Sequence, residues 1–280
     1  MSFGMFFIGR DLPVHRIGLG TSRLVGPGYW GPRETDAAAL LKHAVRRGVD
    51  LIDTADNYGP ALAEELVAEA LHPYATGLAV ATKGGVVRTS ASDWHIDGRP
   101  EALKAAAEAS LKRLRLDTID LYQLHRIDPQ VPLADQLGAL AELRGEGKIR
   151  HIGLDSVTVE QLRAALEITE IVSVQNRFNL LDRESAKVIE LCEVRDIAFL
   201  PWFPLGDGVL TANAPAAVAE IAEAHGATPG QIALAWLLHY SPVILPTPGT
   251  SSREHLDENL AAADIELSDD DMKALAALDG

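Results

Sequence analysis

Four polar residues are the strongest candidates for chemistry in this chain, because each lies in or just after a short apolar segment. They are Asp53, Tyr58, Lys83 and His125. A tyrosine hydroxyl has an ordinary pKa near ~10 and is therefore a poor acid at neutral pH. A lysine cation beside it favours the phenolate and lowers that pKa, and an aspartate can hold the lysine charged and in place. With a histidine to hydrogen-bond a carbonyl oxygen, this set could donate a proton to an alkoxide as it forms.

Each of these residues taken alone also has a structural explanation. Asp53 could cap the helix that follows, Lys83 could be one solvated charge among many, and His125 could be a structural histidine. Their joint position at the ends of successive predicted strands favours a shared site instead. Repeated strand–helix units that carry functional side chains at the carboxyl ends of their strands are typical of a closed barrel.

Short apolar segments alternate with helix-length amphipathic segments along most of the chain. The expected strands are residues 17–19, 51–53, 78–82, 119–124, 149–154, 171–175, 198–201 and 243–246. The expected helices are residues 35–47, 62–71, 100–114, 133–146, 159–168, 183–195, 215–225 and 253–262. Eight strands with helices between them predict parallel pairing and an α/β fold of the (β/α)8 TIM-barrel type.

Three further elements lie outside this alternation. Residues 6–8 and 14–17 flank a polar turn and predict an N-terminal β-hairpin. Thr228 and Pro229 begin an extra helix over residues 231–238, as its N-cap and its first helical residue. Ser268 caps a second extra helix over residues 269–278, whose acidic first turn complements the helix dipole. Because no linker or low-complexity segment interrupts the pattern, residues 1–280 are expected to form a single domain.

The composition argues against several classes of protein. A net charge of −15 disfavours nucleic-acid binding, which needs clustered Lys and Arg. The apolar stretch at residues 3–8 is too short to span a membrane, so no membrane partner is expected. The single Cys192 cannot form an internal disulfide, which suits a buried thiol in a reducing compartment. The histidines are scattered without a metal-binding motif. We therefore expect a cytoplasmic protein without a metal, and a monomer is compatible with the sequence.

The longest loops follow the first, third and seventh predicted strands, at residues 21–33, 84–99 and 204–214. Long loops on one face of a barrel commonly carry specificity. These loops contain Tyr29, Trp30, Trp94 and Phe203, in a chain with only 5% aromatic residues. The aromatic side chains could pack on their own loops, but several are expected to line the opening of a substrate pocket.

The chain resembles the aldo-keto reductases from about residue 17 to the C-terminal helix. The segments that carry the resemblance are residues 18–21, 53–58, 82–85, 120–125, 148–154, 174–176, 204–206, 248–250 and 258–259. None is decisive singly, but their order and spacing together are specific. The resemblance implies a barrel with two extra helices and a nicotinamide dinucleotide, NADP(H), lying extended across the strand ends.

The residues toward the cofactor follow from this resemblance, position by position. Residues 18–20 mimic the start of a Rossmann fingerprint, but Arg23 stands where the third glycine belongs and no helix opens there, so a Rossmann domain is rejected. Gly20 and Thr21 are expected near the nicotinamide, Gln175 on its carboxamide, and Trp202 stacked on its ring. The remaining positions implied for NADP(H) are Asp53, Asp155, Ser156, Pro204, Leu205, Gly206, Gly249, Thr250, Ser251, Arg253, Glu258 and Asn259.

Within this set, the backbone of residues 204–206 is expected at the pyrophosphate, and Glu258 and Asn259 at the adenine. Residues 249–253 lead into a helix and suit the adenosine 2′-phosphate through hydroxyls, helix N-terminal amides and a guanidinium. Plain helix capping is the alternative for the serines there, and capping does not exclude phosphate binding.

Two positions depart from the pattern of the resemblance. Family members usually have Ser-Asn or a close relative where this chain has Asp155-Ser156. A carboxylate there would favour the oxidised, positively charged nicotinamide unless a partner such as Arg177 compensates it. The basic position that some NADPH-specific members use is Gly249 here, so a preference for NADPH depends on Arg253, the hydroxyls and His255.

The activity implied is NADPH-dependent reduction of an aldehyde or ketone to an alcohol. Tyr58 would protonate the oxygen, Lys83 and Asp53 would tune Tyr58, and His125 would orient the carbonyl. The resemblance is strongest to a bacterial branch linked to pyridoxal reductase-like enzymes, which suggests a small aromatic aldehyde. The substrate pocket is expected to contain Trp30, Trp94, Arg126 and Phe203.

Three other functions remain open from the sequence. A hydrolase built on strand-end carboxylates would leave Tyr58 and Lys83 unexplained, and no nucleophile elbow is present. A cofactor-binding regulatory subunit would bind the dinucleotide with little turnover, since fold alone does not license activity. A purely structural protein would bind no cofactor at all.

Overall fold

Parallel strands form a curved sheet at the centre of the computed structural model, which describes residues 4–278. The sheet has seven strands in the order β11-β10-β9-β8-β5-β4-β3. Strands of this sheet that follow one another in the chain are therefore neighbours, and the sheet grows in one direction from β3. Their bounds are β3 Leu19–Gly20, β4 Leu51–Asp53, β5 Ala79–Gly84, β8 Ile119–Leu124, β9 Ile149–Asp155, β10 Ser173–Gln175 and β11 Ala198–Phe199. Nearly every residue of these strands is buried, which explains why the sequence shows continuous apolar runs there rather than alternation.

The segment 243–249 closes this sheet into a barrel. It makes parallel bridges with both edge strands, from Ile244 to Phe199 of β11 and from Gly249 to Gly20 of β3. The eighth strand expected at residues 243–246 is present only as these bridges. Pro246 lies within it and has no N–H, so a continuous ladder of hydrogen bonds cannot form. The expected (β/α)8 barrel is confirmed, with the last strand irregular.

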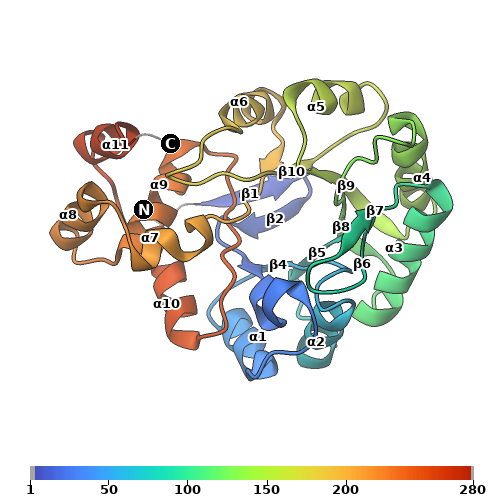
Figure 1. Ribbon diagram of the computed structural model, residues 1–280, viewed down its shortest axis with the longest axis horizontal. Coiled ribbons are helices and arrows are strands. Elements are labelled where there is room, and N and C mark those ends of the chain that lie inside the picture. The colour runs from blue at the N-terminus through green and yellow to red at the C-terminus, as the bar shows by residue number, and fades with distance from the viewer. Residues whose placement is uncertain (1–3, 279–280) are drawn as a thin grey trace.

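Helices cover the outside of the barrel (Figure 1). Their bounds are α1 Ala37–Arg46, α2 Leu62–Leu71, α3 Pro100–Leu114, α4 Leu133–Gly145, α5 Val159–Leu166, α6 Ala186–Arg195, α7 Val209–Ala212, α8 Ala216–Ala224, α9 Pro229–Tyr240, α10 Arg253–Ala261 and α11 Asp269–Ala276. The two extra helices expected from their caps are α9 and α11. Thr228 and Ser268 each accept a hydrogen bond from the third helical residue and form capping boxes.

An N-terminal hairpin covers the bottom of the barrel. It comprises β1 Met5–Ile8 and β2 Leu12–His15, which pair antiparallel. Ile8, Leu12 and Val14 pack in one apolar cluster with Leu51 and Ala79, which stand at the beginnings of barrel strands. The opposite end of the barrel, where the strands finish, is therefore left for the long loops.

The long loops contain structure that the sequence pattern did not predict. Residues 84–99 include a hairpin of β6 Val86–Arg88 and β7 Trp94–Ile96, in which Arg88 is paired with Trp94. Residues 21–33 contain two short 3₁₀ turns, at Ser22–Leu24 and Pro27–Tyr29. Cys192 is buried on α6, as expected for a core thiol, and burial raises its pKa to about 12. Across residues 4–278, no helix has the length and apolarity to cross a membrane.

Candidate active site

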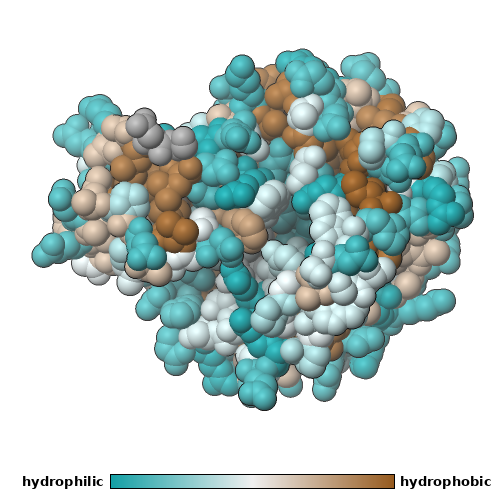
Figure 2. All heavy atoms as spheres, in the orientation of Figure 1, coloured by the Kyte–Doolittle hydropathy of each residue, from teal (hydrophilic) through white to brown (hydrophobic). Residues whose placement is uncertain are grey.

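A cavity of about 810 Å³ opens where the barrel strands end, and its lining runs from Gly20 near the N-terminus to Asn259 on α10. Figure 2 shows this face of the molecule hollowed near its middle, with hydrophilic residues around the opening. Asp53, Tyr58 and His125 line the cavity, as predicted. Lys83 lies directly behind them, fully buried.

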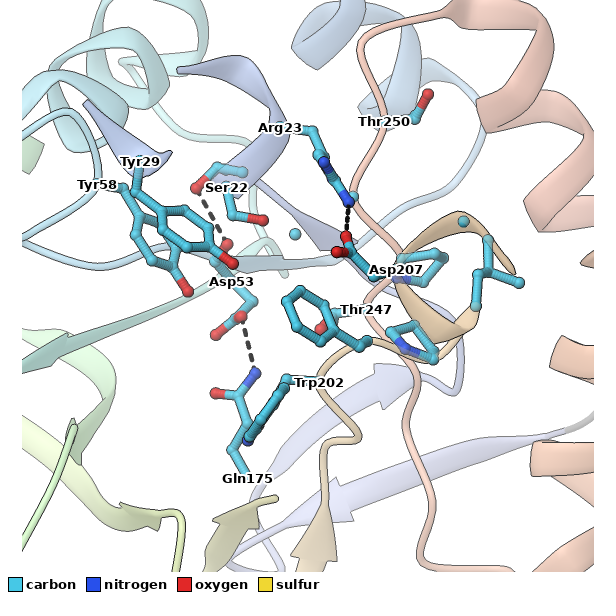
Figure 3. Close-up of a pocket in the computed structure, with 18 of the residues that line it drawn as sticks. Ser22, Arg23, Tyr29, Asp53, Tyr58, Gln175, Trp202, Asp207, Thr247 and Thr250 are labelled. Atoms are coloured by element: carbon cyan, nitrogen blue, oxygen red, sulfur yellow. Dashed lines mark hydrogen bonds and ion pairs between the residues drawn. The ribbon is translucent and has the colours of Figure 1, made fainter. Parts of the chain in front are cut away.

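Asp53 and Lys83 form a buried ion pair between neighbouring strands. Lys83 Nζ donates to Asp53 Oδ1 at 2.8 Å and to the carbonyl oxygen of Thr54 at 2.8 Å. The other carboxylate oxygen of Asp53 accepts from Gln175 Nε2 at 3.0 Å (Figure 3). A buried pair of charges is tolerated when hydrogen bonds satisfy its remaining atoms, and these contacts do so.

Tyr58 stands over this ion pair. Lys83 Nζ lies 5.5 Å from the centre of its ring, and the ring of His125 meets it edge-on at 6.2 Å between centroids. Burial, followed by the negative charge of Asp53, raises the pKa of Tyr58 well above its usual value. The expected lowering of this pKa is therefore not found, because desolvation penalises the phenolate and Asp53 adds to the shift in the same direction. Tyr58 therefore keeps its proton at neutral pH.

His125 is a neutral imidazole in this environment. Burial, together with the positive charges of Lys83, Arg126 and Arg88, lowers its pKa well below the usual value. Its Nδ1 is buried and has no hydrogen-bond partner among residues 4–278. A neutral histidine carries one N–H donor and one acceptor, so this ring can hydrogen-bond a carbonyl oxygen without carrying a charge.

The partner that compensates the charge of Asp155 is Arg126, and not Arg177, the example considered from the sequence. Arg126 Nη1 donates both to Asp155 Oδ1 and, at 2.8 Å, to the carbonyl oxygen of His125. Ser156 Oγ also donates to Asp155 Oδ1, at 2.6 Å. Arg177 instead pairs with Asp182, its Nε 2.7 Å from Oδ2. Burial still raises the pKa of Asp155 to about 6, with Arg126 opposing the shift.

Most of the residues predicted for the cofactor line the cavity. They are Gly20, Thr21, Asp53, Asp155, Gln175, Trp202, Pro204, Leu205, Gly249, Thr250, Glu258 and Asn259. Ser156, Gly206, Ser251 and Arg253 do not line it, and Arg253 is exposed at the first position of α10. Among the predicted substrate residues, Trp94, Arg126 and Phe203 line the cavity, whereas Trp30 lies outside it and is 39% exposed.

Several lining residues were missed by sequence reasoning. They are Ser22, Arg23, Asn57, Val86, Arg88, Asp207, Gly208, Thr211, Ala212, Thr228, Pro229, Gly230, Thr247 and Pro248. Tyr29, one of the loop aromatics expected at the pocket opening, lines the cavity, and its ring stacks on Tyr58 at 5.4 Å between centroids. Arg23 and Asp207 form an ion pair between the loops that follow β3 and β11 (Figure 3). No local pattern signals that pair, because its members are far apart in the sequence.

The lining has the chemistry that a dinucleotide requires. Trp202 presents a large ring whose Nε1 is buried without a hydrogen-bond partner in the described part of the chain. Ser252 caps α10 by accepting from His255 N at 3.3 Å, and Thr250 and His255, on either side of this cap, line the cavity. Helix N-terminal amides and hydroxyls are suitable donors to phosphate. The residues present therefore fit a phosphorylated nicotinamide dinucleotide.

Comparison with known proteins finds relatives that match almost the whole chain. The model of the aldo/keto reductase family matches residues 16–279. Pyridoxine 4-dehydrogenase of Escherichia coli is 39% identical and aligns with 100% of this chain and 99% of its own. An uncharacterized oxidoreductase of Schizosaccharomyces pombe is 46% identical over 92% of this chain and 84% of its own.

Solved structures give the same result. The thermostable aldo-keto reductase Tm1743, in complex with the inhibitor epalrestat, has a TM-score of 0.87 and 32% identity, covering 98% of this chain and 99% of its own. An aldo-keto reductase of Klebsiella pneumoniae in complex with NADPH has a TM-score of 0.82 and 28% identity, covering 99% of this chain and 95% of its own.

Proposed function

The chain belongs to the aldo-keto reductase family, and we propose that it is an NADPH-dependent enzyme that reduces a small aromatic aldehyde, with Tyr58 as proton donor. One observation carries the proposal: a protonated tyrosine, a neutral histidine and a buried Asp53–Lys83 pair converge on one cavity. Residues suited to a phosphorylated dinucleotide line the same cavity. NADPH held by these residues would supply the hydride for the carbonyl carbon.

The chain's own residues handle the oxygen. His125 donates its one N–H to the carbonyl oxygen and orients it. Because the imidazole is neutral, it is not repelled by the nearby cations Lys83, Arg126 and Arg88. Tyr58 gives its proton to the oxygen as negative charge develops there, and the alcohol forms. The phenolate left behind faces Lys83, whose charge stabilises it until a proton from solvent restores the hydroxyl.

Pyridoxal is the first substrate to test. It is a small aromatic aldehyde, and the E. coli relative at 39% identity is a pyridoxine 4-dehydrogenase, which is named for the corresponding alcohol. Tyr29, Trp94 and Phe203 offer aromatic surfaces along the cavity for such a ring.

An aldehyde panel with purified protein tests this proposal. NADPH oxidation should accelerate with pyridoxal and with simple benzaldehydes, followed by the absorbance of the reduced nicotinamide. Saturable cofactor binding without turnover of any aldehyde or ketone would instead indicate a cofactor-binding regulatory subunit. Failure to bind NADPH at all would overturn the proposal.

The preference for NADPH over NADH can be tested at α10. We propose that Arg253, although exposed, reaches the 2′-phosphate together with Thr250 and His255, which line the cavity. Arg253→Ala should weaken NADPH roughly ten- to a hundredfold and NADH much less, because only NADPH carries that phosphate and hydrogen bonds to charged groups are strong. Fluorescence titration with both cofactors measures these affinities. An equal loss of affinity for NADPH and NADH would show that Arg253 does not bind the 2′-phosphate.

A further inference from the structure

We infer that the substrate of this enzyme carries an oxyanion, a carboxylate or phosphate group, which Arg88 binds beside Tyr29 in the cavity. The inference rests on the proposed function and narrows its substrate class. It follows from the position of Arg88, from the pairing of the charges around it and from its unsatisfied donors.

Arg88 is held close to the reacting residues by a hairpin. It ends β6, and its backbone partner Trp94 on β7 lines the same cavity. Its guanidinium carbon lies 5.3 Å from the centre of the Tyr29 ring. Tyr29 in turn stacks on Tyr58 at 5.4 Å, with 20° between the ring planes. A group bound by Arg88 therefore lies one aromatic ring away from the proposed proton donor.

The other cations of the cavity are already paired with carboxylates. Lys83 pairs with Asp53, Arg126 with Asp155, and Arg23 with Asp207. Among residues 4–278, no carboxylate oxygen lies within 4.0 Å of the Arg88 guanidinium. His125 is neutral and adds no charge. Arg88 therefore leaves an uncompensated positive charge in the cavity lining, in a chain whose net charge is −15.

Arg88 also has hydrogen-bond donors without acceptors. Its Nε is buried, with no partner in the described part of the chain. Its Nη1 reaches only the carbonyl oxygen of Ala91, at a long 3.4 Å. A guanidinium has five N–H donors arranged for bidentate binding of carboxylate or phosphate. Because a buried donor left unpaired costs free energy, an oxyanion that supplies the missing acceptors would bind here with a net gain.

Arg126, predicted from the sequence for the substrate pocket, does not serve this purpose. Its Nη1 donates to Asp155 and to the His125 carbonyl oxygen, and the Asp155 carboxylate compensates its charge. It holds the end of β9 beside the loop after β8, and a substrate anion would have to compete with a buried carboxylate for it. Arg88 has no such competitor.

Two matched aldehydes test the inference. Para-carboxybenzaldehyde carries a carboxylate, and para-nitrobenzaldehyde has nearly the same shape without a net charge. The ratio of their kcat/KM values in wild-type protein with saturating NADPH is the reference, and comparing variants cancels the greater intrinsic reactivity of the nitro compound. Arg88→Met should lower this ratio roughly ten- to a hundredfold, the effect expected for a charged hydrogen bond. Arg88→Lys should restore part of it.

A control separates local binding from long-range attraction. Arg195→Met removes an exposed guanidinium from α6, outside the cavity, and changes the net charge by the same amount. It should leave the ratio unchanged. Pyridoxal 5′-phosphate and pyridoxal form a second pair, which distinguishes a phosphate from a carboxylate as the preferred group.

The outcomes are distinguishable from a failure of the proposed function. An equal loss for both aldehydes in Arg88→Met, or no loss for either, would overturn the anion site while leaving the reductase activity established. Calorimetric binding of para-toluate to the complex with NADP⁺ does not depend on turnover, because this carboxylate has no aldehyde or alcohol group to react. If no aldehyde is reduced but Arg88→Met weakens this binding, the proposed function fails and the anion site stands. Unweakened binding would overturn the anion site.

Discussion

The proton on the Tyr58 hydroxyl is retained because of where the ring lies. Sequence reasoning considered only the lysine beside it, and a cation alone would lower the pKa. The structure adds burial of the whole ring and the carboxylates of Asp53 and Asp155, which all disfavour the phenolate. The residue types were therefore predictable from the sequence, but the protonation balance was not, because it depends on how much water the fold excludes.

Removal of the Tyr58 hydroxyl tests its role directly. Tyr58→Phe should lower kcat for aldehyde reduction roughly 10²–10⁴-fold, the usual contribution of a general acid, while NADPH affinity changes little. Single-turnover kinetics and a cofactor titration measure the two quantities. If the variant retains more than about a tenth of wild-type turnover while chemistry limits the rate, Tyr58 is not the proton donor.

Asp155 makes the stability of the protein depend on pH in an unusual direction. Burial raises its pKa to about 6 from an ordinary 3.8, although Arg126, Lys83 and the Ser156 hydroxyl all oppose the shift. Between these values the folded protein binds more protons at this site than the unfolded chain does. The stabilisation from this proton is therefore complete below about pH 4 and is lost as the pH rises through about 6.

Asp155→Asn should abolish this loss. Relative to the wild type, the variant should gain up to about 3 kcal/mol of unfolding free energy between about pH 4 and pH 7. Asp155→Ser should show the same trend, since it also lacks the carboxyl. Urea unfolding of the cofactor-free proteins across this range measures the gain. Curves that stay parallel would mean that Arg126 fully compensates the carboxylate in the folded state.

At the scale of elements, the sequence predicted those whose ends carry local signals. The bounds of α2 and α3 match the prediction, and Pro100 at the first helical position marks where α3 begins. The β6–β7 hairpin was missed because its strands have three residues each and are half exposed, so they show no alternation. The eighth strand was placed correctly, but its prolines leave only bridges at its edges.

Contact between neighbouring strands also explains a glycine in the Thr82–Gly85 segment. A Cβ at Gly84, the last residue of β5, would overlap the hydroxyl oxygen of Tyr122 on β8. That hydroxyl is buried and has no hydrogen-bond partner among residues 4–278. The tyrosine oxygen is therefore the main obstacle to a side chain at this position, ahead of Tyr122 Cζ at 3.1 Å and Ala106 Cβ at 3.3 Å.

Gly84→Ala should destabilise the protein by about 1–3 kcal/mol through overpacking. In the double variant with Tyr122→Phe, much of that loss should be recovered, because the overlapping atom is gone. Gly138→Ala in α4 is the control, since its added methyl group meets nothing and should stabilise the helix. Guanidinium unfolding of the set gives the coupling energy, and strictly additive losses would show that the hydroxyl is not the obstacle.

Across the whole molecule, the sequence predicted those site residues that stand at the ends of strands. It did not predict the contacts that form between distant loops. Asp53 and Lys83 follow from their positions at the ends of β4 and β5. The Arg23–Asp207 pair and the choice of Arg126 over Arg177 as partner of Asp155 depend on how distant loops fold back over the barrel. One sequence contains no local pattern that fixes such distances.

The cavity lies at the place where the first strand and the irregular last strand meet to close the barrel. Gly20 on β3 bridges to Gly249 in the irregular last strand, and both residues line the cavity. Because this closure has few backbone hydrogen bonds, a ligand bound only by the closed barrel should stabilise the whole fold. NADPH at a hundred times its dissociation constant should add about 2.7 kcal/mol of unfolding free energy. In a protein of this size that corresponds to a rise in Tm of roughly 5–10 °C.

A thermal-shift titration, with the dissociation constant measured independently by fluorescence, checks this value. Tyr58→Phe should show the same rise in Tm, because the hydroxyl takes part in proton transfer rather than in holding the dinucleotide. Protease resistance at fixed temperature should increase in parallel, since cleavage follows the population of open molecules. If NADPH saturates the protein in fluorescence without raising Tm, it binds the open and the closed barrel equally, and the lining residues from Gly20 to Asn259 do not form its site.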